Sequence, residues 1–403
     1  MPYCLQYLEK LVSFDTVSGT PPERDCPNTE LIRWVQAEAE RFGAATRVQS
    51  AADGKANLFV QLGGNPEHFT GLMMTGHSDT VNCDAERWAT APRTLTIIGD
   101  KAYGLGACDM KGFIAVAMNR MREAAETQSV PADGLALLVT CDEETSMQGA
   151  RVAAPWLKSM GVAPKLVVVG EPTALTPIFG HKGFMGERLT ITGKSAHSSD
   201  PRQGRNAIAS GVPSAVIALN TMAQAMMEAP DPDFDRPDRP GVPYPTLNLG
   251  VIRGGDSVNR VCSRVEVDFD VRPMTQWNAD RVNRELALLA KRLTEEVNLP
   301  VTIEALYPDV PPFRNDDAAV KTAVERVTGC PGEFVSYCTE AGFMATLGPT
   351  VVLGPGSIRE AHAVDEFVPL KDLERMGTML EKLGRLRSRT YGSVAGSVCF
   401  DFS

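Results

Sequence analysis

Several features that mark other protein classes are missing from this chain. It has no stretch of 18 apolar residues, so we expect no membrane-spanning helix. Its formal net charge is −10 and it has no run of lysine or arginine, which argues against nucleic acid as a partner. Residues 1–19 lack a basic segment followed by a long apolar one, so we expect an amphipathic helix there rather than a signal peptide.

Cysteine pairs at metal-binding or disulfide spacing are also missing. The nine cysteines are scattered, odd in number and never spaced as C-x-x-C. This excludes a cysteine-rich zinc module and gives no sign of a disulfide framework. Cys108 and Cys141 adjoin residues discussed below, and we expect both to be small apolar fillers. Reduced thiols predict a cytoplasmic protein.

The chain does have enough apolar residues for a large core, at 43% of 403 residues. A length of this order predicts two domains, at roughly 150 residues each. Strand-like segments, three of them almost wholly apolar, alternate with a helix-like segment, 109–126, in the first part of the chain. This pattern is typical of an α/β domain with a mainly parallel sheet covered on both faces. The strand-like segments are 55–63, 70–76, 134–140 and 165–170, and 350–356 adds another near the end.

The middle of the chain follows a different pattern. Segments there alternate apolar and polar residues, and their order β-α-β-β-α-β predicts a small α+β domain with one open sheet face. The strands are 186–194, 246–254, 263–273 and 301–308, and the helices are 206–229 and 278–297, the latter capped by Asn278. We therefore expect a discontinuous larger domain, 1–180 with 309–403, and a small inserted domain, 181–308.

Two further segments carry weaker signals. The acidic, proline-rich stretch 231–245 lacks the glycine and final glutamate of a calcium loop, so we interpret it as a solvated loop. We predict no helix or strand for the tail 392–403.

Histidines and carboxylates follow the buried strands in a regular way. His77 and Asp79 come after 70–76, Glu143 and Glu144 after 134–140, Glu171 after 165–170 and His362 after 350–354, while Asp109 opens the helix 109–126. The carboxyl ends of parallel strands meet at one edge of a sheet, where ligands bind. We therefore expect these side chains to gather there, although each motif alone is more often structural.

This set of donors suits metal ions. Two histidines with three or more carboxylates are ligands for Zn²⁺, Mn²⁺ or Co²⁺, and five of them suffice for two ions that share one carboxylate. Because Glu143 and Glu144 are adjacent, one can bind a metal while the other acts as a general base. Asp79 lies two residues from His77 and is placed to accept the other imidazole N–H.

The motifs that carry these residues resemble a known family. "GHSDTV", "DMKGF", "DEETSMQGA", "GEPT" and a late histidine are similar to those of the two-zinc aminoacylases and carboxypeptidases. The resemblance covers nearly the whole chain and includes "SAHSSDPRQGRNAI" in the inserted domain. It implies that 181–308 is a lid and dimerisation domain and that 1–180 with 309–403 is the catalytic domain. Further stretches, "GHKG", "PYPTLNLG", "GGDSVNR", "CTEAGF" and "LGPGSI", resemble one branch whose members release an amino acid from its N-acetyl derivative.

The resemblance implies a role for each residue. His77 and Glu171 would hold one zinc ion, Glu144 and His362 the other, and Asp109 would bridge them. Glu143 would be the general base and proton shuttle, with Asp79 orienting His77. His197 would be lent across a homodimer to stabilise the oxyanion in the neighbouring active site.

The substrate side is less determined by the sequence. A substrate carboxylate needs an anchor, and an arginine suits it because the guanidinium is bidentate and permanently charged. Arg260, which follows Asn259, is a better candidate than Arg272, which lies at the end of a strand where salt bridges are common. We expect Gly342 to lie in a loop near the pocket, where a side chain would obstruct the substrate.

The whole pattern predicts a metal-dependent hydrolase of N-acyl amino acids. A desuccinylase, a deacylase for another amino acid and a dipeptidase remain alternatives, since the chemistry is the same. A non-catalytic dimeric ligand-binding protein is a remote alternative, because it should have lost metal ligands and every one is present.

Overall fold

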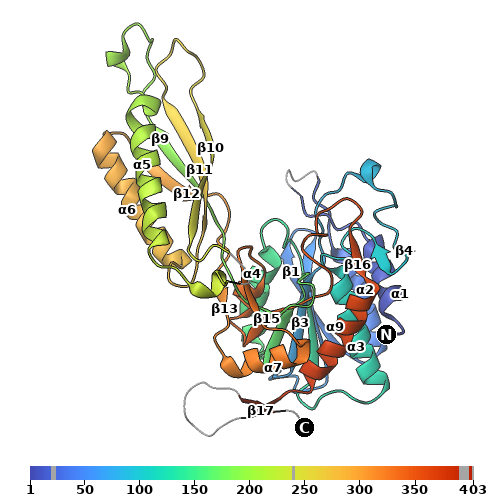
Figure 1. The fold of residues 1–403 in the computed structure, drawn as a ribbon. Helices are drawn as coiled ribbons and strands as arrows, with labels where there is room; N and C mark the ends of the chain where they lie inside the picture. The colour runs from blue at the N-terminus through green and yellow to red at the C-terminus, as the bar shows by residue number, and fades with distance from the viewer. Residues whose placement is uncertain (20–23, 238–240, 390–398, 402–403) are drawn as a thin grey trace. The chain divides into compact units, whose positions relative to one another are not determined.

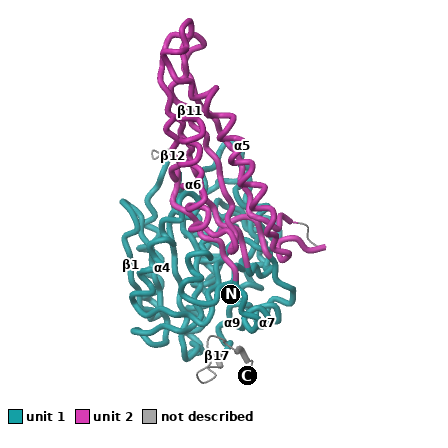
Figure 2. The backbone as a smooth tube through the Cα atoms, turned by 90° about the vertical axis from the view of Figure 1, so that its left-hand side faces the viewer, with its two compact units in different colours: residues 1–179, 315–333, 339–403 teal, residues 180–314, 334–338 magenta. Residues whose placement is uncertain are grey.

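The computed structural model describes residues 1–19, 24–237, 241–389 and 399–401. Contacts between Cα atoms divide the chain into two compact units (Figure 2). Unit 1 comprises Met1–Phe179, Asn315–Glu333 and Thr339–Ser403, and unit 2 comprises Gly180–Arg314 and Phe334–Cys338. Each unit has its own sheet and helices.

Unit 1 is built on a mixed sheet whose strands run in the order β1-β2-β6-β3-β7-β15-β8. The four central strands β6, β3, β7 and β15 are parallel, whereas β1, β2 and β8 are antiparallel to their neighbours. The bounds are β1 Ala45–Ala52, β2 Lys55–Leu62, β3 Leu72–His77, β6 Leu135–Thr140, β7 Leu166–Val169, β15 Thr350–Val352 and β8 Ile178–His181. The last two residues of β8, Gly180 and His181, belong to unit 2 and pair with its short strand β13 (Phe313–Arg314), and β14 (Glu333–Val335) also pairs with β8.

The α/β fold class is thus confirmed, but the sheet is parallel only at its centre. The strand at 55–62 is antiparallel because a tight turn joins it to β1, with Ala52 opposite Lys55 in the register. Consecutive strands joined by so short a turn must be antiparallel. The prediction of a mainly parallel sheet missed β1 and with it this hairpin.

Helices cover the sheet of unit 1. Every residue of β2, β3, β6 and β7 is buried, as expected for strands with helices on both faces. α1, α3 and α9 pack side by side, α2 and α4 pack on β1 and β2, and α7 lies against α9 (Figure 1). Their bounds are α1 Cys4–Ser13, α2 Thr29–Arg41, α3 Lys111–Glu126, α4 Gln148–Ser159, α7 Ala318–Thr328, α8 Ala341–Met344 and α9 Leu370–Gly384. The helix expected at the N-terminus is α1.

A small antiparallel sheet in unit 1 escaped the sequence interpretation. Its order is β16-β5-β4, with bounds Phe367–Pro369, Lys101–Tyr103 and Thr96–Ile98. Strands of three residues are too short for an alternating pattern to identify them.

Unit 2 has the element order that the sequence predicts. An antiparallel sheet, β10-β11-β9-β12, carries the two long helices α5 and α6 on one face (Figure 1). The bounds are β9 Met185–Thr192, α5 Ala207–Met227, β10 Thr246–Gly254, β11 Arg264–Arg272, α6 Ala279–Val297 and β12 Val301–Ala305. The side chain of Asn278 caps α6 by accepting from the backbone N–H of Arg281 at 3.0 Å.

Two segments predicted to be irregular make contacts that the sequence did not predict. The stretch 231–245 is not simply solvated, because Asp231 and Asp233 both form ion pairs with Arg314. In the tail, β18 (Cys399–Asp401) pairs with β17 (Arg387–Arg389), where we had predicted no strand. The remaining tail residues, 392–398 and 402–403, lie outside the described residues.

The structure also bears on the absences in the sequence. No helix in the described part of the chain is long and apolar enough to cross a membrane. The cysteines that the structure describes are all free, and Cys108 and Cys141 are buried, as expected of apolar fillers.

Candidate metal centre

The register of the central strands brings the predicted residues to one edge of the sheet. His77 is the last residue of β3 and lies opposite Thr140, the last residue of β6. Thr75 pairs with Val169 at the end of β7. The loops that follow β6 and β7 therefore begin beside His77, and they carry Glu143, Glu144 and Glu171.

A glycine allows α3 to approach this edge closely. A Cβ atom on Gly170 would lie 2.0 Å from the ring of Phe113 in α3, which is far inside van der Waals contact. Only glycine fits between β7 and this helix, and the next residue is Glu171. The start of α3, just after Asp109, is thereby packed against the ends of the strands.

Asp109 lies between the two histidines. Its Oδ1 is 3.0 Å from Nε2 of His77, and its Oδ2 is 3.5 Å from Nε2 of His362. Nε2 of His362 is also 2.9 Å from the carboxylate of Glu144. His77, Asp109, His362 and Glu144 thus form a continuous row of neighbouring side chains.

Two overlapping groups of donors are close enough to hold ions. The ligand atoms of His77, Glu143 and Glu171 lie within 4.8 Å of one another, and so do those of His77, Asp109 and Glu144. The first group contains Glu143, the residue expected to be a base and not a ligand. The described residues thus bring all five expected ligands and the expected base into one cluster, with the division between two ions left open.

The electrostatics of the cluster favour a bound cation. Burial, with the nearby charges of other carboxylates, raises the pKa values of Glu143 and Glu171 well above the ordinary range. Burial opposes protonation of His77, yet the hydrogen bond to Asp109 and the surrounding acids raise its pKa well above the usual value. The Oε1 atom of Glu171 is buried with no hydrogen-bond partner among the described residues. Several carboxyl groups crowded together, one of them with an unpaired buried oxygen, have the chemistry expected of metal ligands.

Asp79 makes contacts that differ from those expected. The Nδ1 atom of His77 is 3.1 Å from the backbone carbonyl of Asp79 and 3.6 Å from its carboxylate. Its carboxylate instead accepts the backbone N–H of Glu144 at 3.1 Å. Asp79 thus links the loop after β3 to the loop after β6.

The loop after β6 is held by a buried ion pair that the sequence did not reveal. Asp142 has a left-handed backbone, with φ of 56°. Its carboxylate lies 2.9 Å from Nζ of Lys55 and accepts the hydroxyl of Ser18 at 2.8 Å. Lys55 is buried and also contacts Asp25 at 2.8 Å. Strained backbone held by surrounding contacts is common at functional sites, and Glu143 is the next residue.

Other carboxyls missed by the sequence analysis lie near the cluster. Glu340 is fully buried, and burial raises its pKa to about 7 against the opposing effect of His77. Glu366 is also buried, and its carboxylate accepts the backbone N–H groups of Cys108 and Asp109. Neither follows directly after one of the predicted strands, and that was the signal used to find the others.

Comparisons with known proteins identify the family. The model of the peptidase family M20/M25/M40 matches residues 73–385. The chain belongs to peptidase family M20/M25/M40. An acetylornithine deacetylase of Aliivibrio salmonicida (strain LFI1238) is 37% identical over 385 residues, covering 95% of this chain and 98% of that protein. One of Pasteurella multocida (strain Pm70) is 36% identical over 384 residues, covering 95% and 97%.

Solved structures show the same fold. A tripeptidase from Staphylococcus aureus has a TM-score of 0.68 at 21% identity, covering 95% of this chain and 97% of that one. A dinuclear metal-binding peptidase from Bacillus subtilis has a TM-score of 0.64 at 12% identity, with coverage of 95% and 97%. The predicted resemblance is therefore confirmed, and with it the prediction of a metal-dependent amide hydrolase.

Three of the remaining candidates of this M20/M25/M40 chain, His197, Asn259 and Arg260, lie together in unit 2. His197 and Arg260 form an isolated antiparallel bridge, and the N–H of Ser198 donates to the carbonyl of Asn259 at 3.0 Å. Nδ1 of His197 is 2.7 Å from the hydroxyl of Ser199. The guanidinium of Arg260 is half exposed and pairs with Asp256.

Gly342 and Arg272 both lie in regular secondary structure. Gly342 is buried in the one-turn helix α8 of unit 1, so our placement of it in a loop was wrong. Arg272 ends β11 and pairs with Asp270, which matches the salt bridging expected at the end of a strand.

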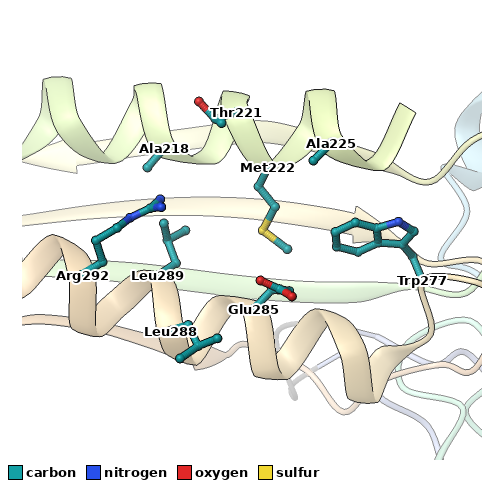
Figure 3. A pocket seen from close by; sticks show the side chains of 9 residues that line it. All are labelled: Ala218, Thr221, Met222, Ala225, Trp277, Glu285, Leu288, Leu289 and Arg292. Carbon is teal, nitrogen blue, oxygen red and sulfur yellow. The ribbon is translucent and has the colours of Figure 1, made fainter. Parts of the chain in front are cut away.

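A cavity in unit 2 lies apart from these candidates. It has a volume of about 310 Å³ and lies between α5 and α6, with Met222 and Trp277 on its walls (Figure 3). Its charged lining residues are Glu285 and Arg292, and neither belongs to a group of possible metal ligands among the described residues. We interpret it as a gap between two helices.

Proposed function

We propose that this chain is a dinuclear zinc amidohydrolase that converts N²-acetylornithine and water into ornithine and acetate, a step of arginine biosynthesis in the cytoplasm. The observation that carries the proposal is the cluster of two histidines and four acids at one edge of the sheet. The choice of substrate is supported by relatives that cover nearly the whole chain.

The metal ligands in this proposal are those expected from the resemblance. His77 and Glu171 hold one Zn²⁺, Glu144 and His362 hold the other, and Asp109 bridges the two, with Co²⁺ or Mn²⁺ as substitutes. When bound, the metal ions supply the Lewis acidity that makes water a nucleophile near neutral pH. Both histidines lie within 3.5 Å of Asp109, which supports the bridging role.

Glu143 is the proposed proton carrier. No hydrogen bond ties its carboxylate to another described residue, so it is free to take a proton from the attacking water. Burial and neighbouring charges raise its pKa well above the usual value, and a carboxyl that holds a proton near neutral pH can pass it to the leaving amine. Asp79 keeps the loop of Glu143 and Glu144 against His77.

The proposal extends to unit 2 through residues that lie together there. We propose that 181–308 serves as lid and dimerisation domain of a homodimer, inserted into a catalytic domain of 1–180 and 309–403. His197 would stabilise the oxyanion in the partner's site. Arg260, beside Asn259, would exchange Asp256 for the substrate carboxylate, and Gly342 would leave room for the substrate.

The test is a comparison of substrates. Hydrolysis of N²-acetylornithine is measured beside N-acetylmethionine, N-succinyl-diaminopimelate and a dipeptide, with Zn²⁺ or Co²⁺ and with a chelator. Metal-dependent turnover that strongly favours acetylornithine supports the proposal. A preference for another substrate moves the chain to a deacylase, desuccinylase or dipeptidase with the same site. Bound metal without any turnover points to an untested acyl group or a lost oxyanion donor, whereas a protein that binds no metal and has no turnover favours the ligand-binding alternative.

The role of His197 has its own test. His197→Ala should lower turnover by about 10²–10³-fold, as the loss of one oxyanion donor does elsewhere, while the zinc content stays unchanged. Loss of zinc from this variant would contradict the role, and the oligomeric state of both proteins shows whether a dimer is present.

A further inference from the structure

The carboxylate of Glu366 receives an unusual number of backbone N–H groups. Its Oε1 accepts from Cys108 at 2.8 Å and from Asp109 at 3.0 Å, and its Oε2 accepts from Gly106 at 2.9 Å. The residue is 2% exposed. Three hydrogen bonds to one buried carboxylate fix the position of the backbone that donates them.

That backbone is the turn leading into Asp109. The N–H of Gly104, at the start of the turn, donates to the backbone carbonyl of Glu366 at 3.1 Å. Gly106 has a left-handed φ of 77°, which suits glycine, and its carbonyl accepts the N–H of Lys111 at 2.8 Å. Both the main chain and the side chain of Glu366 thus clamp the turn.

Glu366 also belongs to the segment that carries His362. Three residues lie between the two, and one of these, Asp365, is anchored because its carboxylate accepts the N–H of Ala89 at 2.7 Å. Directly after Glu366, β16 begins and pairs with β5, with Phe367 opposite Tyr103. The segment that carries Glu366 is therefore held in place at both ends, and the hydrogen bonds of Glu366 connect the turn before Asp109 to this segment.

We propose that Glu366 is a positioning residue that sets the distance between the Asp109 carboxylate and the His362 imidazole. Glu366 acts by holding the backbone of Asp109 to the segment that contains His362. Both proposed ligands of the shared ion are then positioned before the ion binds. The 3.5 Å between Asp109 Oδ2 and His362 Nε2 is the separation that the clamp maintains. This inference rests on the ligand set of the proposed function, but not on its substrate.

The test replaces the carboxylate by an amide of the same shape. In Glu366→Gln, one acceptor oxygen becomes an NH₂ group that faces a backbone donor, so the turn loses at least one hydrogen bond. Zn²⁺ affinity is measured by competition with a chelator, with the stoichiometry, kcat and KM, and the Tm of the metal-free protein. Glu187→Gln is the control, because Glu187 is a buried carboxyl at 3% exposure in unit 2.

We expect Glu366→Gln to bind one of two ions about 10–100-fold more weakly, with a fall in kcat that exceeds any change in KM. The control should keep both ions at the affinity of the unmodified protein. Equal zinc affinities in Glu366→Gln and the unmodified protein would overturn the inference, even if the Tm fell.

A second variant covers the case in which Glu366→Gln does not fold. Glu366→Asp keeps the charge but shortens the side chain, so it should fold and still bind zinc more weakly; unchanged affinity would again overturn the proposal. If the unmodified protein binds two ions but does not hydrolyse acetylornithine, the proposed substrate fails while this inference is still decided by the zinc measurements.

Discussion

The two units arrange their charges in opposite ways. In unit 1, four acids crowd around two histidines at the end of the central strands, with Asp109 and Glu171 buried and Glu143 and Glu144 half-buried. On the open sheet face of unit 2, charges of both signs lie next to one another, both between neighbouring strands and along β11. Arg188 pairs with Asp268 and Glu266, Arg253 also pairs with Asp268, and Arg264 pairs with Glu266.

This difference in charge arrangement distinguishes a candidate metal site from an ordinary solvent-exposed sheet face. Alternating charges on an exposed sheet neutralise one another and need no further partner. Buried acids of one sign cannot all ionise unless a cation joins them. The abundance of charge is therefore no guide to function in this chain, whereas burial together with an uncompensated sign is.

The largest effect should come from the base in unit 1. Glu143→Gln removes the group that takes and returns the proton, so kcat should fall by about 10²–10⁴-fold while both metal ions remain bound. Steady-state kinetics and metal analysis check this. The matched control is Glu266→Gln on the face of unit 2, which should keep nearly full activity. Retained activity in Glu143→Gln would move the proton transfer to another residue.

The next effect concerns a buried ion pair of unit 1. Lys55 is 3% exposed and contacts both Asp25 and Asp142. Lys55→Met leaves Asp142 charged without its cation, so the free energy of unfolding should fall by about 3–5 kcal/mol. Denaturant titration measures it, and kcat should fall as well because Asp142 precedes Glu143. A loss below about 1 kcal/mol would show that the pair behaves like the exposed ones of unit 2.

A third prediction concerns the stability of the metal-free protein against pH. Burial raises the pKa values of Glu340 and Glu366 from 4.5 to about 7, and hydrogen bonds to Asp109 and Glu144 raise that of His362 from 6.5 to about 10. Above the unfolded pKa values the folded state holds protons that the unfolded chain has released, so stability falls as pH rises through these windows. Asp109 has a lowered pKa, so its contribution is lost only in acid, below 3.8.

The Tm of the chelated protein should therefore fall by several degrees between about pH 5 and pH 8, at roughly 2–4 °C for each kcal/mol lost. The zinc-loaded protein should show a flatter profile, because the cation stabilises the ionised acids. A Tm that rises over the same range in the chelated protein would contradict the raised pKa values of these buried groups.

These residues also show how far the sequence could predict the structure. His77, Glu144 and Glu171 could be found because each follows a buried apolar strand, and a sheet with a parallel centre brings such residues together. Lys55 and Glu366 could not, because their role depends on contacts with residues far along the chain, such as Asp142 and Gly106. In unit 2, periodicity predicted the order of elements, but the ion pairs across its open face depend on the strand register.

The smallest effect should come from that face. Arg188 is one-third exposed in its side chain, and its closest contact is 2.6 Å to Asp268. Arg188→Ala should cost about 0–1 kcal/mol of unfolding free energy, since exposed pairs are weak and Asp268 keeps Arg253 as a partner. Activity should be unchanged. Denaturant titration measures the unfolding free energy, and steady-state kinetics measure the activity. A clear loss of turnover in Arg188→Ala would mean that the face does more than neutralise itself, and burial would then no longer suffice to tell functional charges from structural ones.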